Sequence, residues 1–99
     1  MFNVLFLFPK TADPQAVESF IATTVHGMRS QPGQGPVFVS EGALMGPLGR
    51  DLPYSRILQT SIDSPENVMS AINSARAQSS KPVMQELGVM LLLYETREL

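Results

Sequence analysis

Two segments near the ends of the chain are apolar on both faces when they are placed in β-strands. In Phe2–Phe8, Phe and Val side chains alternate with Leu5 and Leu7, and in Val89–Tyr94 every residue is apolar or aromatic. A sheet with helices on one face and water on the other alternates apolar and polar side chains. The second face of these strands would therefore expose a larger apolar patch than monomers normally tolerate.

The length of the chain limits what can cover that second face. The sequence has 99 residues, enough for one modest core, and we treat residues 1–99 as a single domain. The helices are needed on the first face, so we expect a second copy of the sheet to cover the other, giving a homodimer around a two-fold axis. The alternative is that Lys81–Leu87 or the C-terminal tail folds over the exposed side. The dimer is favoured because one short segment cannot cover four strands.

Local signals predict two amphipathic helices. Asp13-Pro14 opens the first, with Asp13 as the N-cap and Pro14 at the first helical position. The residues that recur at helical spacing after it are Val17, Phe20, Ile21, Thr24, Val25 and Met28. Asp63-Ser64-Pro65 opens the second helix in the same way, with Val68, Ile72 and Ala75 on its buried stripe. We expect Ser79-Ser80 to end it and Lys81–Leu87 to form one or two further turns.

Strands are expected at Phe2–Phe8, Pro36–Met45, Tyr54–Ile62 and Val89–Tyr94, and the Gly- and Pro-rich segment 46–53 is expected to be a loop. The element order is thus β-α-β-β-α-β. Right-handed crossovers place both helices on one face of a four-stranded antiparallel sheet. This is an α+β fold, the ferredoxin-like sandwich, whose usual strand order is 4-1-3-2.

Composition excludes several classes of function. Seven Lys and Arg against nine Asp and Glu give a net charge of −2, so no strong field gathers nucleic acid or anionic lipid. The absence of cysteine excludes disulfides and a cysteine nucleophile. One histidine and scattered carboxylates lack the spacing of metal ligands, so we expect no metal site.

The sequence also gives no sign of a membrane or a secretory signal. Its longest apolar stretches are far shorter than the ~20 residues of a spanning helix. The start, Met1–Phe8, has no basic residue and no small-residue cleavage site. We therefore expect a cytoplasmic protein without a membrane partner.

Several short motifs resemble those of EthD-like proteins, from the dimeric α+β barrel superfamily. They are Phe8-Pro9, Asp13-Pro14, Pro32-Gly33, Arg56-Ile57 and Ile62–Glu66, and the resemblance spans roughly Phe2 to Glu95. It implies a ferredoxin-like fold, a homodimer built by packing sheet on sheet, and a small hydrophobic pocket between sheet and helices in each subunit. Relatives of this kind include cofactor-free monooxygenases, muconolactone isomerases and polyketide cyclases, so no cofactor is expected.

The chain departs from the EthD-like pattern at a histidine. Such chains often carry a His in the first helix, eight residues before the Pro of Pro-Gly, and that place is Thr24 here. His26 lies two residues further on, turned by about 200° around the helix from Thr24. His26 is the candidate for proton transfer, and the competing interpretation is a solvent-facing histidine near the end of the helix.

Three residues of the third strand are candidates for binding a ligand. Tyr54 and Arg56 share a face, where they would hold a carboxylate or phenolate, or Arg56 would instead pair with Glu41 across two strands. Gln59 stands where many EthD-like chains have an acidic residue. It is either a polar anchor in a cavity or an ordinary cross-strand hydrogen-bonding residue.

Together these features predict a homodimer that binds a small hydrophobic or aromatic molecule, with any chemistry cofactor-free. The reaction classes implied by the resemblance are monooxygenation, isomerisation and cyclisation. The alternative is a non-catalytic dimerisation or small-ligand-sensing module. A cavity near Tyr54 and Gln59 would favour the first interpretation, and a filled core would favour the second.

Overall fold

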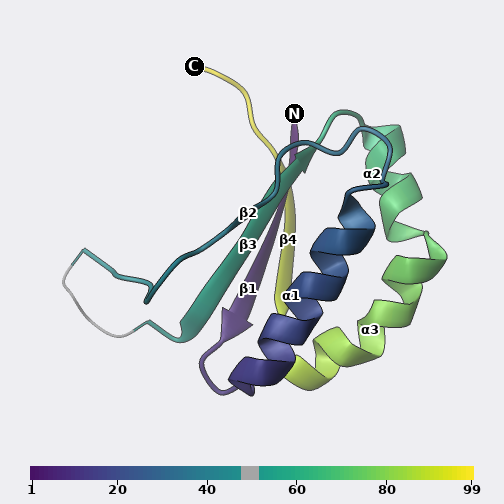
Figure 1. The fold of residues 1–99 in the computed structure, drawn as a ribbon. Helices are drawn as coiled ribbons and strands as arrows, with labels where there is room; N and C mark the ends of the chain where they lie inside the picture. Colours follow the sequence, from purple (N-terminus) through teal and green to yellow (C-terminus); the bar gives the residue numbers. More distant parts are fainter. Residues whose placement is uncertain (48–51) are drawn as a thin grey trace.

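An antiparallel sheet, built from strands of different lengths, forms one layer of the molecule (Figure 1). The computed structural model describes residues 1–47 and 52–99, so the central part of the predicted loop 46–53 lies outside the described residues. Within these residues the sheet has four strands: β1 (Phe2–Pro9), β2 (Phe38–Val39), β3 (Tyr54–Ile62) and β4 (Met90–Glu95). Their order, β2-β3-β1-β4, confirms the predicted ferredoxin-like order with β1 and β3 in the centre.

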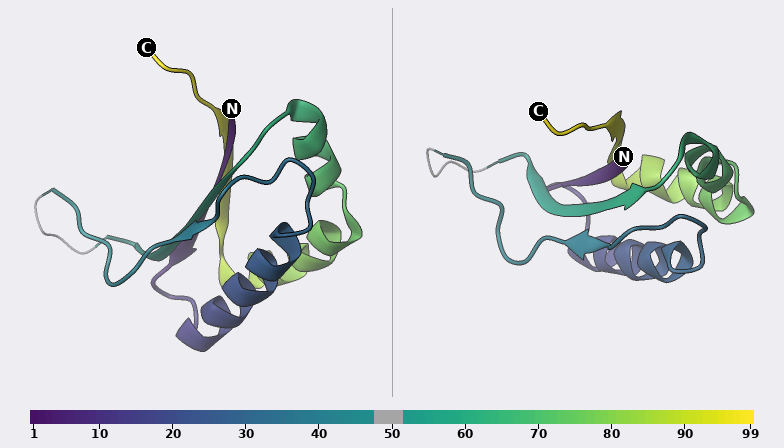
Figure 2. Two further views of the ribbon diagram at one scale, coloured as in Figure 1. Left: turned by 45° about the horizontal axis from the view of Figure 1, so that its top comes forward. Right: turned by 90° about the horizontal axis from the view of Figure 1, so that it is seen from above.

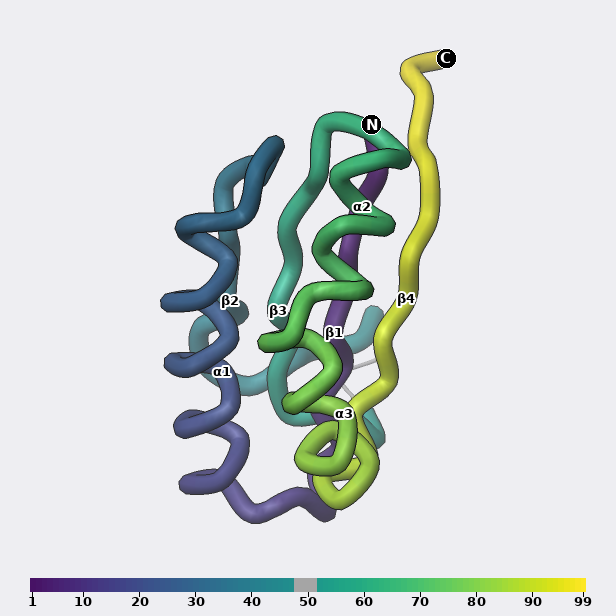
Figure 3. The backbone as a smooth tube through the Cα atoms, turned by 90° about the vertical axis from the view of Figure 1, so that its right-hand side faces the viewer, coloured from purple at the N-terminus to yellow at the C-terminus, as the bar shows by residue number. Residues whose placement is uncertain are grey.

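Helices cover one face of this sheet. They are α1 (Pro14–Met28), α2 (Pro65–Ile72) and α3 (Ala75–Leu87). All lie to the right of the strands in Figure 1, and Figure 3 looks onto them with the strands behind. In the same view α1 stands to one side, while α2 and α3 stand to the other. The helical layer is therefore split above the middle of the sheet.

Two helices begin at the caps that the sequence predicts. The Asp13 side chain accepts a hydrogen bond from the Ala16 N–H at 3.0 Å, and Pro14 occupies the first turn of α1. The Ser64 side chain accepts from the Asn67 N–H at 3.2 Å at the start of α2. In each case a short polar side chain satisfies an N–H that the helix cannot pair internally.

The prediction that Ser79-Ser80 ends a helix is wrong. The interruption lies earlier, at Asn73, and Ser74 caps a new helix by accepting from the Ala77 N–H at 3.1 Å. The Ser79 and Ser80 hydroxyls donate to carbonyls one turn back, at 2.9 and 2.8 Å, a pattern compatible with a continuous helix. The helix α3 even includes Pro82, so Lys81–Leu87 is its second half and not a separate piece.

The second strand is much shorter than the predicted Pro36–Met45. Only Phe38 and Val39 pair as a strand, although single backbone hydrogen bonds continue the contact with β3 on either side. Pro36 has no N–H to donate, and Gly42 adopts a φ of 71°, a turn conformation that favours glycine. Both features end regular pairing at this edge of the sheet.

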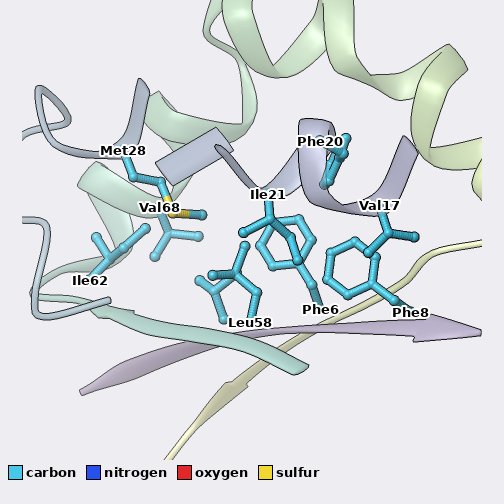
Figure 4. Close-up of a cluster of buried hydrophobic side chains, with 10 residues drawn as sticks. Phe6, Phe8, Val17, Phe20, Ile21, Met28, Leu58, Ile62 and Val68 are labelled. Atoms are coloured by element: carbon cyan, nitrogen blue, oxygen red, sulfur yellow. The ribbon is translucent and has the colours of Figure 1, made fainter. Parts of the chain in front are cut away.

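The core lies between the sheet and the helices (Figure 4). Phe6, Phe8 and Phe20 form its aromatic centre, with the Phe8 and Phe20 rings in edge contact at 5.8 Å between centroids. Leu58 of β3 and Val17 of α1 are also fully buried. The stripe predicted on the first helix supplies Val17, Phe20, Ile21 and Met28 to this core.

None of the helices in the described part of the chain covers the opposite face of the sheet. Register places Leu5 beside Leu92 and Leu7 beside both Ile57 and Met90, so these side chains share the open face. Phe38 and Tyr94 lie on the same face, and Leu92 is 41% exposed. The predicted two-sided character of β1 and β4 is therefore present, and we refer to this surface as the open sheet face.

Neither segment suggested as an alternative cover lies on the open sheet face. Lys81–Leu87 belongs to α3 on the other side, and the tail after β4 extends away from the sheet (Figures 1 and 2). The Thr96 N–H donates to the Met1 carbonyl at 3.1 Å, which keeps the start of this tail beside the N-terminus. No helix in the described part of the chain has the length and apolar character needed to span a membrane.

Candidate functional site

A cavity of about 880 Å³ lies between the sheet and the split helical layer. Its floor comes from three strands, with Val4 and Phe6 of β1, Thr60 and Ile62 of β3, and Leu91 and Leu93 of β4. The walls come from α1 on one side and α2 and α3 on the other. Figure 4 shows Phe6, Phe20, Met28, Ile62 and Val68 gathered at the boundary between these layers. The site is therefore assembled by six elements from across the sequence, three strands and three helices.

The surface of this cavity is mostly apolar, and the polar side chain on its strand floor, Thr60, is already bonded. The Thr60 hydroxyl is buried and donates to the Pro36 carbonyl at 2.9 Å. The same oxygen accepts a hydrogen bond from the Gln34 side-chain amide. These bonds fix the polar floor, while the other floor side chains are apolar, so the cavity suits a ligand with an apolar body.

The charged side chains of the described lining are both basic. They are Arg76, which is half-buried in the first turn of α3, and Lys81, which is exposed one turn later. The Arg76 side chain reaches across to α1 and lies over Gly27, where an added Cβ would be 2.9 Å from the Arg76 Cζ. Only a glycine leaves this space open, so α1 and α3 meet through the Arg76 side chain.

A metal centre has no support in the described residues. No group of three or more His, Asp or Glu side chains is close enough to hold an ion in residues 1–47 and 52–99.

His26 and Thr24 occupy different sides of α1. His26 lies in the last turn, exposed, and is not among the described residues that line the cavity. Thr24, at the position where EthD-like chains often have a histidine, does line it. The role of His26 in proton transfer stays a prediction.

Arg56 pairs with the core residue Phe8 and lies on the helix-covered side of β3, whereas Tyr54 pairs with Pro9 beyond a shift in register. Both residues are outside the described lining of the cavity. Arg56 forms an ion pair with Glu18 of α1, which corrects the predicted pairing with Glu41. The reason is geometric, because β2 has ended before residue 41 and α1 packs directly over this end of β3. The Arg56 Nε is buried without a hydrogen-bond partner.

Gln59 lies on the open sheet face, opposite Leu5 of β1 and Phe38 of β2. The structure therefore separates Arg56 from Gln59, which lie on opposite sides of the sheet. The roles of Tyr54, Arg56 and Gln59 in binding a ligand also stay predictions.

The part of the lining that sequence reasoning missed lies on α3. Arg76, Ser80 and Met84 face the cavity at a spacing of four residues, which is the spacing of one helical face. The four-residue spacing can be read from the sequence, but it indicates a shared helical face only if the helix continues through Ser79 and Ser80. Because a helix end was expected at these serines, the shared face was not predicted.

Comparison with known proteins finds matches in solved structures alone. No family model matches the chain, and a search of curated proteins finds no match. An EthD family protein from Bacillus halodurans is 20% identical, with a TM-score of 0.72 over 98% of this chain and 99% of its own. SnoaB from Streptomyces nogalater, a cofactor-independent oxygenase, is 16% identical, with a TM-score of 0.74 over 99% and 94%.

A dimeric ferredoxin-like protein of unknown function from Jannaschia sp. CCS1 is 9% identical, with a TM-score of 0.77 over 96% of this chain and 98% of its own. At such identities the likeness concerns the fold. The chain therefore has the ferredoxin-like α+β fold found in EthD-like proteins, as its motifs predicted.

Proposed function

We propose that this protein is a homodimer, formed through the open sheet face, in which each subunit binds a small hydrophobic or aromatic molecule. The observation that carries the proposal is the cavity of about 880 Å³ between sheet and helices. Pockets for small molecules typically measure about 300–1,000 Å³ and have apolar walls with a few polar groups. The cavity has this size and this character.

The physical argument is that part of the apolar lining of this cavity faces water. Leu91 and Leu93 on its floor are 39% and 45% exposed. Removing apolar surface from water is favourable by roughly 25 cal/mol per Å². A ligand with an apolar body would cover this surface.

The dimer is supported by the other side of the same sheet. Leu91 lines the cavity, while its neighbour Leu92 points to the open sheet face. Burying each such side chain is worth roughly 1.5–3 kcal/mol, so a second sheet packed there is favourable. The dimeric state of the Jannaschia structure, which has the same fold, supports this arrangement. Ligand and partner would thus occupy opposite faces of one sheet.

The lining favours ligand binding over acid–base catalysis. Its described residues include no histidine and no carboxylate, the groups that most often transfer protons at active sites. This observation supports the ligand-sensing alternative over monooxygenation, isomerisation or cyclisation by His26. The fold of SnoaB, a cofactor-independent oxygenase, is the argument for keeping cofactor-free catalysis as the second candidate.

A bulky substitution inside the cavity tests the proposal. We expect the purified protein to bind the uncharged dye Nile red with enhanced fluorescence, and Thr24→Trp to abolish this because the indole fills the space beside α1. Ala22→Trp is the matched control, since Ala22 is exposed on the same helix and outside the described lining. Equal dye binding by both variants would contradict a ligand site between sheet and helices.

A further inference from the structure

The basic groups at the edge of the cavity have no acidic partners in the described structure. Arg76 and Lys81 are its charged lining residues, and no Asp or Glu accompanies them there. In residues 1–47 and 52–99 no carboxylate pairs with Arg76, and no hydrogen bond involves its guanidinium, whereas Arg56 pairs with Glu18. A half-buried guanidinium beside apolar walls is thus left with its donors unused.

The position of Arg76 is set by two helices. Its backbone lies in the first turn of α3, and its side chain extends over Gly27 of α1. Substituting any larger residue at position 27 would place a Cβ within 2.9 Å of the guanidinium carbon and force the side chain to move. The Arg76 side chain thus lies against α1 at the edge of the cavity.

We propose that Arg76 anchors a carboxylate, and that the ligand class is a hydrophobic carboxylic acid whose apolar body fills the cavity. This inference rests on the proposed function, because it assigns the ligand of that same site. Arginine presents a planar fork of donors that matches the two oxygens of a carboxylate, and such charge-assisted pairs are stronger than neutral hydrogen bonds. The exposed Lys81 adds positive charge where the ligand enters.

A carboxylate fits this site better than a phosphate. A phosphate monoester carries about two negative charges and three acceptor oxygens near neutral pH. The charged groups of the described lining are one half-buried guanidinium and one exposed ammonium. One fork satisfies a single carboxylate, and the apolar floor accepts the rest of the molecule.

The test compares two probes of the same shape in displacing Nile red from the 99-residue chain. The probes are 2-naphthoate, which carries the carboxylate, and 2-naphthamide, which is uncharged. We expect naphthoate to compete roughly tenfold better, a ratio typical of one hydrogen-bonded charge pair. Arg76→Gln should remove this preference while leaving the competition by naphthamide unchanged.

Arg29→Gln is the control for net charge, because Arg29 is exposed at the end of α1 and outside the described lining of this cavity. It should retain the preference. Gly27→Ala provides a second test of the Arg76 anchor if the Arg76→Gln variant does not fold. Alanine favours helix more than glycine does, so the fold should persist while the displaced Arg76 loses several-fold of its preference for naphthoate.

The outcomes separate the two proposals. If Nile red does not bind the wild-type protein, the proposed ligand site fails and this inference fails with it. If the dye binds but both naphthalene probes compete equally, or if Arg76→Gln keeps the preference, only the carboxylate anchor is overturned. Stronger competition by 2-naphthyl phosphate than by naphthoate would overturn the assignment to a carboxylic acid.

Discussion

Leu58 shows how one side chain joins the sheet to the helical layer. It is 0% exposed at the centre of β3, where it pairs with Phe6 of β1 and Val39 of β2 in register. The next residue, Gln59, points to the open sheet face and is exposed. Alternation along a strand thus places a core residue and a surface residue side by side in the sequence.

Replacing Leu58 by alanine should lower the free energy of unfolding by about 3 kcal/mol, because it removes buried methyl groups and leaves a cavity in the core. Gln59→Ala, the neighbouring control, should change it by less than about 0.5 kcal/mol, as surface substitutions usually do. Urea denaturation of both variants measures the difference. Similar losses for the two would contradict the observed register of β3.

The sequence predicts where a side chain lies when its neighbours are close along the chain. It does not predict contacts with residues of distant elements. An offset of two residues on a helix turns the side chain by about 200°, which correctly separated the exposed His26 from Thr24. The partner of Arg56 was not predictable in this way. Glu18 lies on another element, and only the packing of α1 on β3 brings the two together.

At the level of elements, the boundary between α2 and α3 decides the shape of the cavity. The Ser74 hydroxyl accepts from the Ala77 N–H at 3.1 Å and donates to the Ala71 carbonyl at 2.8 Å, so it serves the end of one helix and the start of the next. The change of direction lets α3 present Arg76, Ser80 and Met84 to the cavity.

Ser74→Ala should therefore lower the free energy of unfolding by about 1 kcal/mol, the usual cost of losing an N-cap. Ser79→Ala is the matched control in the middle of α3, where alanine is the better helix former and stability should stay the same or rise slightly. Thermal unfolding followed by circular dichroism compares them. A larger loss for Ser79→Ala would place the helix boundary at Ser79-Ser80 after all.

On the scale of the whole molecule, both faces of the sheet carry apolar side chains. The three described helices cover one of these faces. The open sheet face gathers Leu5, Leu7, Ile57, Leu92 and Tyr94 from its central and edge strands. Neither α3 nor the tail covers them (Figure 2). A second copy related by a two-fold axis supplies a matching apolar surface, which is the basis of the proposed dimer.

We expect the wild-type protein to sediment at about twice its chain mass of 10.8 kDa. Leu92→Glu should shift it to the monomer, because it places a charge in the centre of the proposed interface. Met69→Glu is the control, since Met69 is an equally apolar, exposed residue on α2, away from the open sheet face. Sedimentation velocity at micromolar concentration distinguishes these states, and a monomeric wild type would refute the dimer.

The sequence by itself determined the features that depend on neighbours along the chain. Caps at Asp13 and Ser64, the helical stripe of α1, the alternation of β3 and the two-sided strands β1 and β4 all follow from local chemistry and period. Connection rules then gave the strand order, because few topologies suit this succession of elements.

Only the tertiary structure decided where the cavity lies and which side chains meet there. The cavity exists because α1 and the α2–α3 pair stand apart over the sheet, and Arg76 reaches it because Gly27 on another helix leaves room. Such contacts join residues about fifty positions apart, and no local period encodes their distance. The physical reason is that local propensity fixes the direction of a side chain, whereas packing of whole elements fixes what that side chain faces.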